Sequence, residues 1–229
     1  MARLEWDQTG DRLYETGTDR GVLYPKNANG QYGTGVAWNG LTGVSESPSG
    51  AEESKLFADN QKYLSLYSAE EFGCTIEAYT YPDEWAACDG SAALGDGVYV
   101  GQQARRGFGF TYRTILGNDE QGESYGYKLH IIYGASASPS EKSYSTVNDS
   151  PEAITFSWTV TTTPITINAS LKPTAIITID STKIDSAKLA AIEDILYGTD
   201  GGSGSTAADP ALIMPSKIIE ILEDSTIHS

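Results

Sequence analysis

The stretch that decides the fold is KYLSLYSAEEFGCTIEAYTYPDEW, which runs from Lys62 to Trp85. Tyr, Ile and Thr favour strands, and apolar residues alternate with polar ones on both sides of the short acidic segment at residues 68–71. The pattern predicts two half-buried strands joined by a tight turn, so that residues 62–81 form a central hairpin. Pro82 is typical of a first helical position and predicts a short helix directly after this hairpin.

Three later segments show the same two-residue period, at residues 107–116, 125–133 and 153–163. A glycine- and acid-rich linker at 117–122 predicts a hairpin turn between the first two. Strands with one apolar and one polar face indicate an antiparallel sheet with one buried face. The apolar spacing between Ser186 and Gly198 predicts one helix, capped at these two residues, that packs on the sheet. The sequence therefore predicts a mainly β fold with one flanking C-terminal helix and a short helix after the central hairpin.

The remaining segments suggest how the chain is organised. We expect residues 1–200 to form a single domain with an extended N-terminal arm at 10–35, a hairpin turn at Asn39-Gly40 and a long polar loop at 45–60. Residues 201–229 begin with a flexible Gly/Ser-rich linker and end in a tail whose apolar residues need a surface to pack on.

Composition excludes several classes of protein. The formal net charge is −16 and the isoelectric point is about 4.4, whereas nucleic-acid binding needs clustered Lys and Arg. The first residues contain no apolar signal sequence, and no apolar run approaches the roughly 20 residues that span a bilayer. We therefore expect no membrane association, and we expect Cys74 and Cys88 to be free thiols in a reducing environment.

Catalytic motifs are missing from the sequence. The two histidines are His130 and His228, and we expect His130 to face solvent or an interface. No phosphate-binding glycine motif is present, and the adjacent carboxylate pairs lie in predicted turns, where they do not flank a cleft. We expect no enzymatic activity, no metal site and no cofactor. Four aromatic residues offer surfaces on which a sugar could stack, although core or subunit contacts are favoured for them: Tyr32, Trp38, Tyr79 and Trp85.

Several blocks of the chain resemble the major tail, or tail-tube, proteins of long-tailed, non-contractile bacteriophages. Besides residues 62–85, they are GVAWNGLT at 35–42, ESPSGAE at 46–52, GQQ at 101–103, YKLH at 127–130, IYGA at 132–135, NDSPEA at 148–153, FSW at 156–158, TTTP at 161–164 and KPT at 172–174. The resemblance covers roughly residues 4–200 and does not extend into 201–229.

This resemblance implies a β-sandwich or barrel-like tail-tube fold that self-assembles into hexameric rings. The rings stack into the phage tail tube, a conduit for DNA during ejection, with no catalysis. The implied partners are further copies of the chain, the tape-measure protein, the tail terminator, distal tail or baseplate proteins, and viral DNA that passes without specific binding. The implied location is the tail of the virion, after assembly in the bacterial cytoplasm.

Two groups of residues are candidates for contacts in such a tube. Candidates for the subunit or ring-stacking interface lie in the predicted 45–60 loop: Ser47, Pro48, Ser49, Gly50, Glu52 and Glu53. Candidates for the channel wall, where carboxylates would repel DNA, are Glu70, Glu71 and Glu77. Two alternatives remain open: a carbohydrate-binding β-sandwich such as a phage adhesin, and a hydrolase that uses acidic residues.

Overall fold

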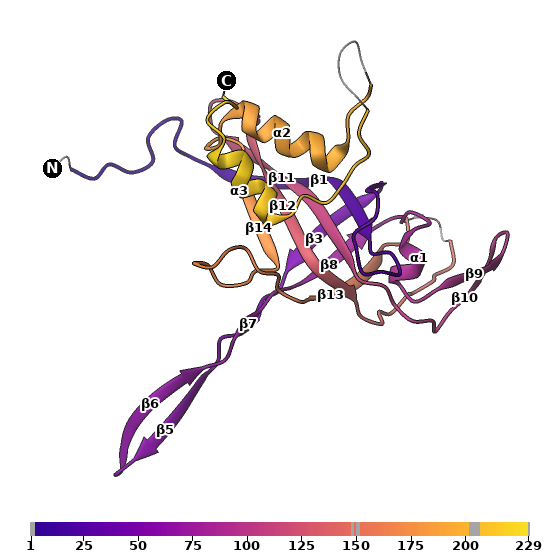
Figure 1. Cartoon of the computed structure of the whole chain (residues 1–229), viewed down its shortest axis with the longest axis horizontal. Helices are drawn as coiled ribbons and strands as arrows, with labels where there is room; N and C mark the ends of the chain where they lie inside the picture. The colour runs from indigo at the N-terminus through magenta and orange to yellow at the C-terminus, as the bar shows by residue number, and fades with distance from the viewer. Residues whose placement is uncertain (1–2, 148, 150–151, 202–206, 229) are drawn as a thin grey trace.

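A computed structural model describes residues 3–147, 149, 152–201 and 207–228. The protein is mainly β, as predicted, with one large antiparallel sheet, three smaller two-stranded sheets and three helices among the described residues. Figure 1 shows a body made of the large sheet and the helices, from which a long two-stranded ribbon projects into solvent.

The large sheet has the strand order β2-β1-β11-β12-β13-β8-β3, and β14 pairs with part of β12. Its strands are β1 (Tyr14–Pro25), β2 (Val36–Trp38), β3 (Leu41–Glu46), β8 (Gly73–Ala78), β11 (Phe108–Asn118), β12 (Gly122–Ala137), β13 (Phe156–Thr162) and β14 (Ile176–Asp180). The segments predicted at 107–116, 125–133 and 153–163 all form strands of this sheet, and the turn between β11 and β12 lies where the linker predicted it.

The sheet curls so that its two ends approach each other and one face lines an interior core. Trp38, Trp85 and Trp158 form the centre of this core, with ring centroids 4.7 to 5.5 Å apart. Side chains from both halves of the sheet complete it: Leu23, Cys74, Ile76, Phe108, Phe110, Tyr112, Ile132 and Val160. Full burial of aromatic side chains of this size contributes strongly to the stability of the fold.

A second core lies on the outer face of β1, β11, β12 and β14, under the helices α2 (Ser186–Tyr197) and α3 (Pro215–Glu223) (Figure 1). Leu189, Ile192 and Leu196 of α2 are buried against it, and Ile218 and Ile221 of α3 join them. The apolar residues of the C-terminal tail therefore pack on the body of their own chain.

Two buried phenols fasten these helical segments to the sheet. The Tyr24 hydroxyl donates to the carbonyl of Leu196 at 2.7 Å, and the Tyr133 hydroxyl donates to the carbonyl of Ile213 at 2.9 Å. The hydroxyls are buried and carry hydrogen-bond partners, so they hold α2 and the approach to α3 in place without leaving unpaired polar groups.

The helix ends agree with the sequence in part. Gly198 ends α2 with a φ of +79°, as predicted, but the N-terminal cap is Asp185, whose carboxylate accepts from the backbone N–H groups of Ala187 and Lys188. The predicted short helix is α1 (Trp85–Cys88), and a turn from Pro82 leads into it. Residues 202–206 of the predicted flexible linker lie outside the described residues.

The central hairpin predicted at residues 62–81 is wrong. Residues 61–67 form β6, which pairs with β5 in a separate two-stranded sheet, whereas β8 pairs with β3 and β13 in the main sheet. Only β8 is half buried, because β6 lies outside the body. The prediction fails because the chain already turns back at Asp59 and Asn60, so that β6 pairs with the preceding strand β5 and not with the following strand β8.

The Asn39-Gly40 turn is present, but the strands on its two sides do not form a hairpin. β2 pairs with β1, and β3 pairs with β8. The turn instead connects the two ends of the curled sheet, where the Trp38 indole N–H donates to the carbonyl of Thr80. It therefore closes the interior core at one corner.

Both cysteines are free and fully buried, as predicted. Burial raises the pKa of each thiol to about 12, so almost no thiolate exists at pH 8. We expect a thiol reagent at pH 8 to modify neither residue in the folded protein and both after denaturation without reductant. An Asn39→Cys variant, with its new thiol on an exposed turn, provides the reactive control. Fewer than two thiols in denaturant would contradict the free-thiol assignment.

Candidate assembly interface

The most prominent exposed element is an arm formed by residues 49–71. Its base is the pairing of β4 (Ser49–Gly50) with β7 (Glu70–Glu71), and its outer part is the pairing of β5 (Glu53–Ala58) with β6 (Gln61–Tyr67). The long loop predicted at 45–60 is therefore wrong, since β4 and β5 lie within it. Figure 1 shows the arm extending away from the main sheet, with β5 and β6 at its far end.

The tip of the arm is a tight turn at two residues with left-handed backbone. Asp59 has a φ of +50° and Asn60 a φ of +61°. Two-residue hairpins favour positive φ at both central positions, and Asn and Asp tolerate it better than most residues. This dipeptide is the sequence signal that identifies β5 and β6 as partners.

One face of the arm carries a polar cluster centred on Glu53, flanked by the exposed aromatic side chains of Phe57 and Tyr67. Its carboxylate accepts hydrogen bonds from Lys62 and from the Ser65 hydroxyl, and Lys55 lies 3.4 Å away. The hydrogen bonds from Lys62 and Ser65 lower the pKa of Glu53. Because all of these groups belong to β5 and β6, they fix the register of the two strands on the solvent-exposed side.

The other face carries three leucines. Leu56 lies directly opposite Leu64, and Leu66 follows two residues later on the same face. Their exposed fractions are 43%, 37% and 54%, although leucine side chains normally lie in a core. An isolated two-stranded hairpin is at best marginally stable in water. The leucine face (Leu56, Leu64 and Leu66) is therefore an apolar surface that the rest of the described chain leaves partly uncovered.

The arm's base requires glycine at one position. Gly50 has a φ of +87°, and a Cβ atom there would lie 2.2 Å from the carbonyl oxygen of Ala69. The two segments of the arm can approach each other this closely because glycine has no side chain.

The structure places eight of the nine predicted site residues in or next to this arm. Ser47 and Pro48 connect β3 to it, and the others lie along it: Ser49, Gly50, Glu52, Glu53, Glu70 and Glu71. Gly50 pairs with Glu70 and Ser49 with Glu71, so the proposed interface and channel residues share one short ladder. All eight are exposed.

Glu77 lies apart from them. It belongs to β8 in the main sheet, opposite Gly43 of β3 and Ser157 of β13, with an exposed side chain on the face away from the interior core. Ile76 and Ala78 on either side of it are buried. Glu77 is thus available to a channel wall only if this outer face of the sheet lines it.

Sequence reasoning missed a second projecting hairpin. β9 (Ala92–Gly95) pairs with β10 (Val98–Val100), and every residue of both strands is exposed. Leu94, Val98 and Tyr99 leave a further apolar surface uncovered. The Asp96-Gly97 turn between two short apolar segments was the available signal.

The aromatic residues considered for sugar binding do not form a common surface. Trp38 and Trp85 are buried in the interior core, Tyr32 is half-buried, and its hydroxyl accepts from the N–H of Gly134. Tyr79 is the exposed member of the set. The geometry gives no stacking platform built from these four residues.

The prediction that His130 faces solvent or an interface is wrong for the isolated chain. Its side chain is buried, with a residue exposure of 7%, and it stacks on Tyr112 with ring centroids 4.5 Å apart. The hydroxyls of Thr114 and Thr178 lie at 3.0 and 3.3 Å from the two ring nitrogens. Burial lowers the pKa of His130, which favours the neutral imidazole in the core at pH 7.

No protein-family model matches the chain, and no curated protein matches its sequence. Among the described residues, no helix combines the length and apolar character needed to cross a membrane.

Proposed function

We propose that the chain is a structural protein of a bacteriophage tail, which self-assembles into stacked hexameric rings to form the tail tube. The observation that carries the proposal is the exposed leucine face of the arm. Monomeric soluble proteins rarely leave large apolar patches uncovered, and such patches mark interaction sites. A repeating assembly would bury this face without a dedicated binding partner, because each copy carries both the arm and the surface that receives it.

Two further features support a repeating assembly. The first is the β9–β10 hairpin, a second projecting apolar element. The second is that β3 and the first half of β1 each pair on one edge, with β8 and β11, and leave the other edge without a strand partner within the described residues. Open strand edges are hazardous in a monomer because they template pairing with other chains. In a closed ring of identical subunits, the same edges and hairpins become specific contacts.

The acidic surface suits a conduit for DNA. A wall that attracted phosphates would retain the passing duplex, whereas a net charge of −16 per subunit repels it. We propose that Ser47 to Glu53 contribute to contacts between subunits or rings and that Glu70, Glu71 and Glu77 face the channel. In this assembly the partners are other copies, a tape-measure protein, a tail terminator and distal tail proteins.

The direct test is to image the purified protein and to measure its molar mass in solution. We expect light scattering to report a mass that rises with protein concentration and negative-stain micrographs to show rings or tubes. The reason is that each subunit exposes several apolar elements to solvent. Strict monomers at millimolar concentration, without rings in the micrographs, would count against a tube protein. Glycan binding by such a monomer would instead support an adhesin.

A further inference from the structure

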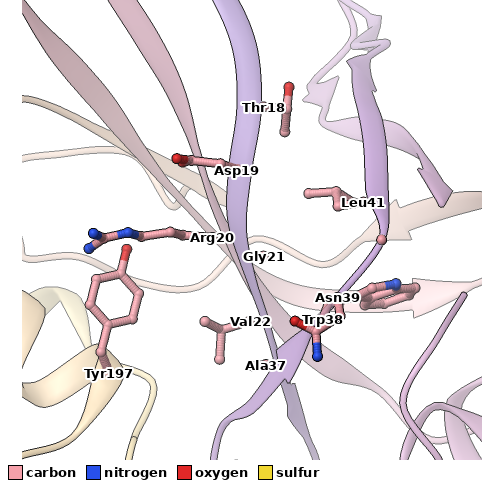
Figure 2. A pocket seen from close by; sticks show the side chains of 11 residues that line it. Thr18, Asp19, Arg20, Gly21, Val22, Ala37, Trp38, Asn39, Leu41 and Tyr197 are labelled. Atoms are coloured by element: carbon pink, nitrogen blue, oxygen red, sulfur yellow. The ribbon is translucent and has the colours of Figure 1, made fainter. Parts of the chain in front are cut away.

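A cleft of about 550 Å³ lies where the two ends of the curled sheet separate (Figure 2). β2 covers the edge of β1 only from Gly21 to Leu23, so the edge before Gly21 is open there. Figure 2 shows Arg20 and Tyr197 on one side of β1, with Leu41, Asn39 and Trp38 on the other. The cleft therefore has one polar and one largely apolar wall.

The polar wall contains two groups suited to a carboxylate. Arg20 forms no ion pair within the described residues, because the nearby Asp19 is bound by Arg113 at 2.7 and 2.9 Å. The buried hydroxyl of Tyr197 has no hydrogen-bond partner within the described part of the chain, and burial raises its pKa to about 12. A positive guanidinium and a protonated phenol offer hydrogen-bond donors to an anion.

The N-terminal segment has the complementary chemistry. Leu4 and Trp6 are 74% and 72% exposed, and Trp6 lies between two acids, Glu5 and Asp7, which form no ion pair within the described residues. The aromatic ring of Trp6 suits the apolar wall of the cleft, and a carboxylate beside it suits Arg20 on the polar wall. In Figure 1 this segment projects from the body.

The segment does not occupy the cleft of its own chain. Gly10 is held at the β11–β12 turn, where its N–H donates to Asp119 and its carbonyl accepts from Asn118. Residues 4–7 extend from there into solvent, and none of them lines the cleft.

We infer that residues 4–7 of one copy bind in this cleft of a neighbouring copy. Trp6 packs on the apolar wall beside Leu41, and an adjacent carboxylate binds Arg20 and Tyr197. The inference rests on the proposed self-assembly and adds a specific contact to it. It also gives an anionic partner to Arg20, whose guanidinium lies 5.9 Å from the centre of the Tyr197 ring and forms no ion pair within the described residues.

The test is a pair of engineered cysteines in the full chain. Leu4→Cys combined with Asn39→Cys places one thiol in the segment and one at the cleft while Trp6 and both acids stay in place, and both native thiols are buried. Mild oxidation of the assembled protein should give intermolecular disulfides and a ladder of multimers on a non-reducing gel. Leu4→Cys with Tyr144→Cys is the matched control, since Tyr144 is exposed but does not line the cleft. Equal ladders from both pairs, or none from the cleft pair, would overturn the inference.

A charge exchange supplies the second measurement. Arg20→Glu should raise the concentration needed for assembly at least tenfold, and adding Glu5→Arg and Asp7→Arg should largely restore it. Normal tubes from the Arg20→Glu variant without cross-links from the cleft pair would refute the contact and leave the tube proposal intact. Cross-linked pairs without rings or tubes would support the contact and refute the tube.

Discussion

Replacing Leu56, Leu64 and Leu66 together by serine is expected to abolish the assembly of rings and tubes while leaving the body folded. Burying a fully exposed leucine side chain contributes about 1.5–3 kcal/mol, and these three are 37–54% exposed, so about half of that gain remains for each. Loss of the three contacts costs about 3 kcal/mol per interface, which corresponds to roughly a hundredfold weaker association. The body should keep its melting temperature, because the interior core contains none of these residues. Light scattering and negative-stain microscopy measure the assembly, and thermal melting measures the fold.

A matched control lies on the opposite face of the same ribbon. Lys55→Gln removes one charge beside Glu53 but leaves Lys62 and Ser65 on that carboxylate, so the hairpin keeps its register. We expect this variant to assemble normally. If the leucine variant also assembles at the wild-type concentration, the leucine face is not an interface and the main support for the proposed function is lost.

The strands of the main sheet were predictable because their signal is local. In β11, β12 and β13 one face packs into a core, so apolar and polar residues alternate with the period of a strand. The turn at residues 118–122 and the end of α2 at Gly198 were equally local. Each of these features depends on residues that are neighbours in the sequence.

The error at residues 62–81 has a physical origin that bears on function. Leu64 and Leu66 alternate with polar residues as they would in a half-buried strand, but within the described chain they stay 37% and 54% exposed. The alternation in β6 indicates an apolar face, but the predicted pairing with the following strand was wrong, because β6 pairs with β5. If the leucine face is covered in a ring, the alternation in β6 describes the assembly and not the monomer.

The cleft could not be predicted from the sequence. Arg20 and Tyr197 are 177 positions apart, and they meet because α2 packs on the outer face of β1. Neither residue lies in a motif, and Arg20 belongs to an irregular part of β1 where the register shifts. Sites that depend on how a sheet curls leave no signal in a short window of sequence.

Gly134→Ala is expected to be the most destabilising single substitution of a glycine in the body. β12 pairs with β14 up to Ile132 and with β13 from Ala135 onward, and Gly134 lies at this change of partner. Its φ is +60°, and a Cβ atom would lie 2.2 Å from the carbonyl oxygen of Thr163. The left-handed backbone alone costs an alanine about 1–2 kcal/mol. The clash with a backbone atom adds to that cost, because β13 must move away from β12 to relieve it.

Gly122 provides the control that separates these two costs. Its φ of +56° is similar, but a Cβ atom there would meet nothing within 4 Å, so Gly122→Ala introduces only the strain of the backbone conformation. We expect a loss of about 1 kcal/mol there and at least about 3 kcal/mol for Gly134→Ala, in line with the effects of other core disruptions. For a chain of this length, these losses correspond to drops in melting temperature of about 2–4 °C and at least about 6 °C. Equal drops for the two variants would show that the end of β13 does not pack against Gly134. That result would contradict the change of partner from β14 to β13 at this point of β12.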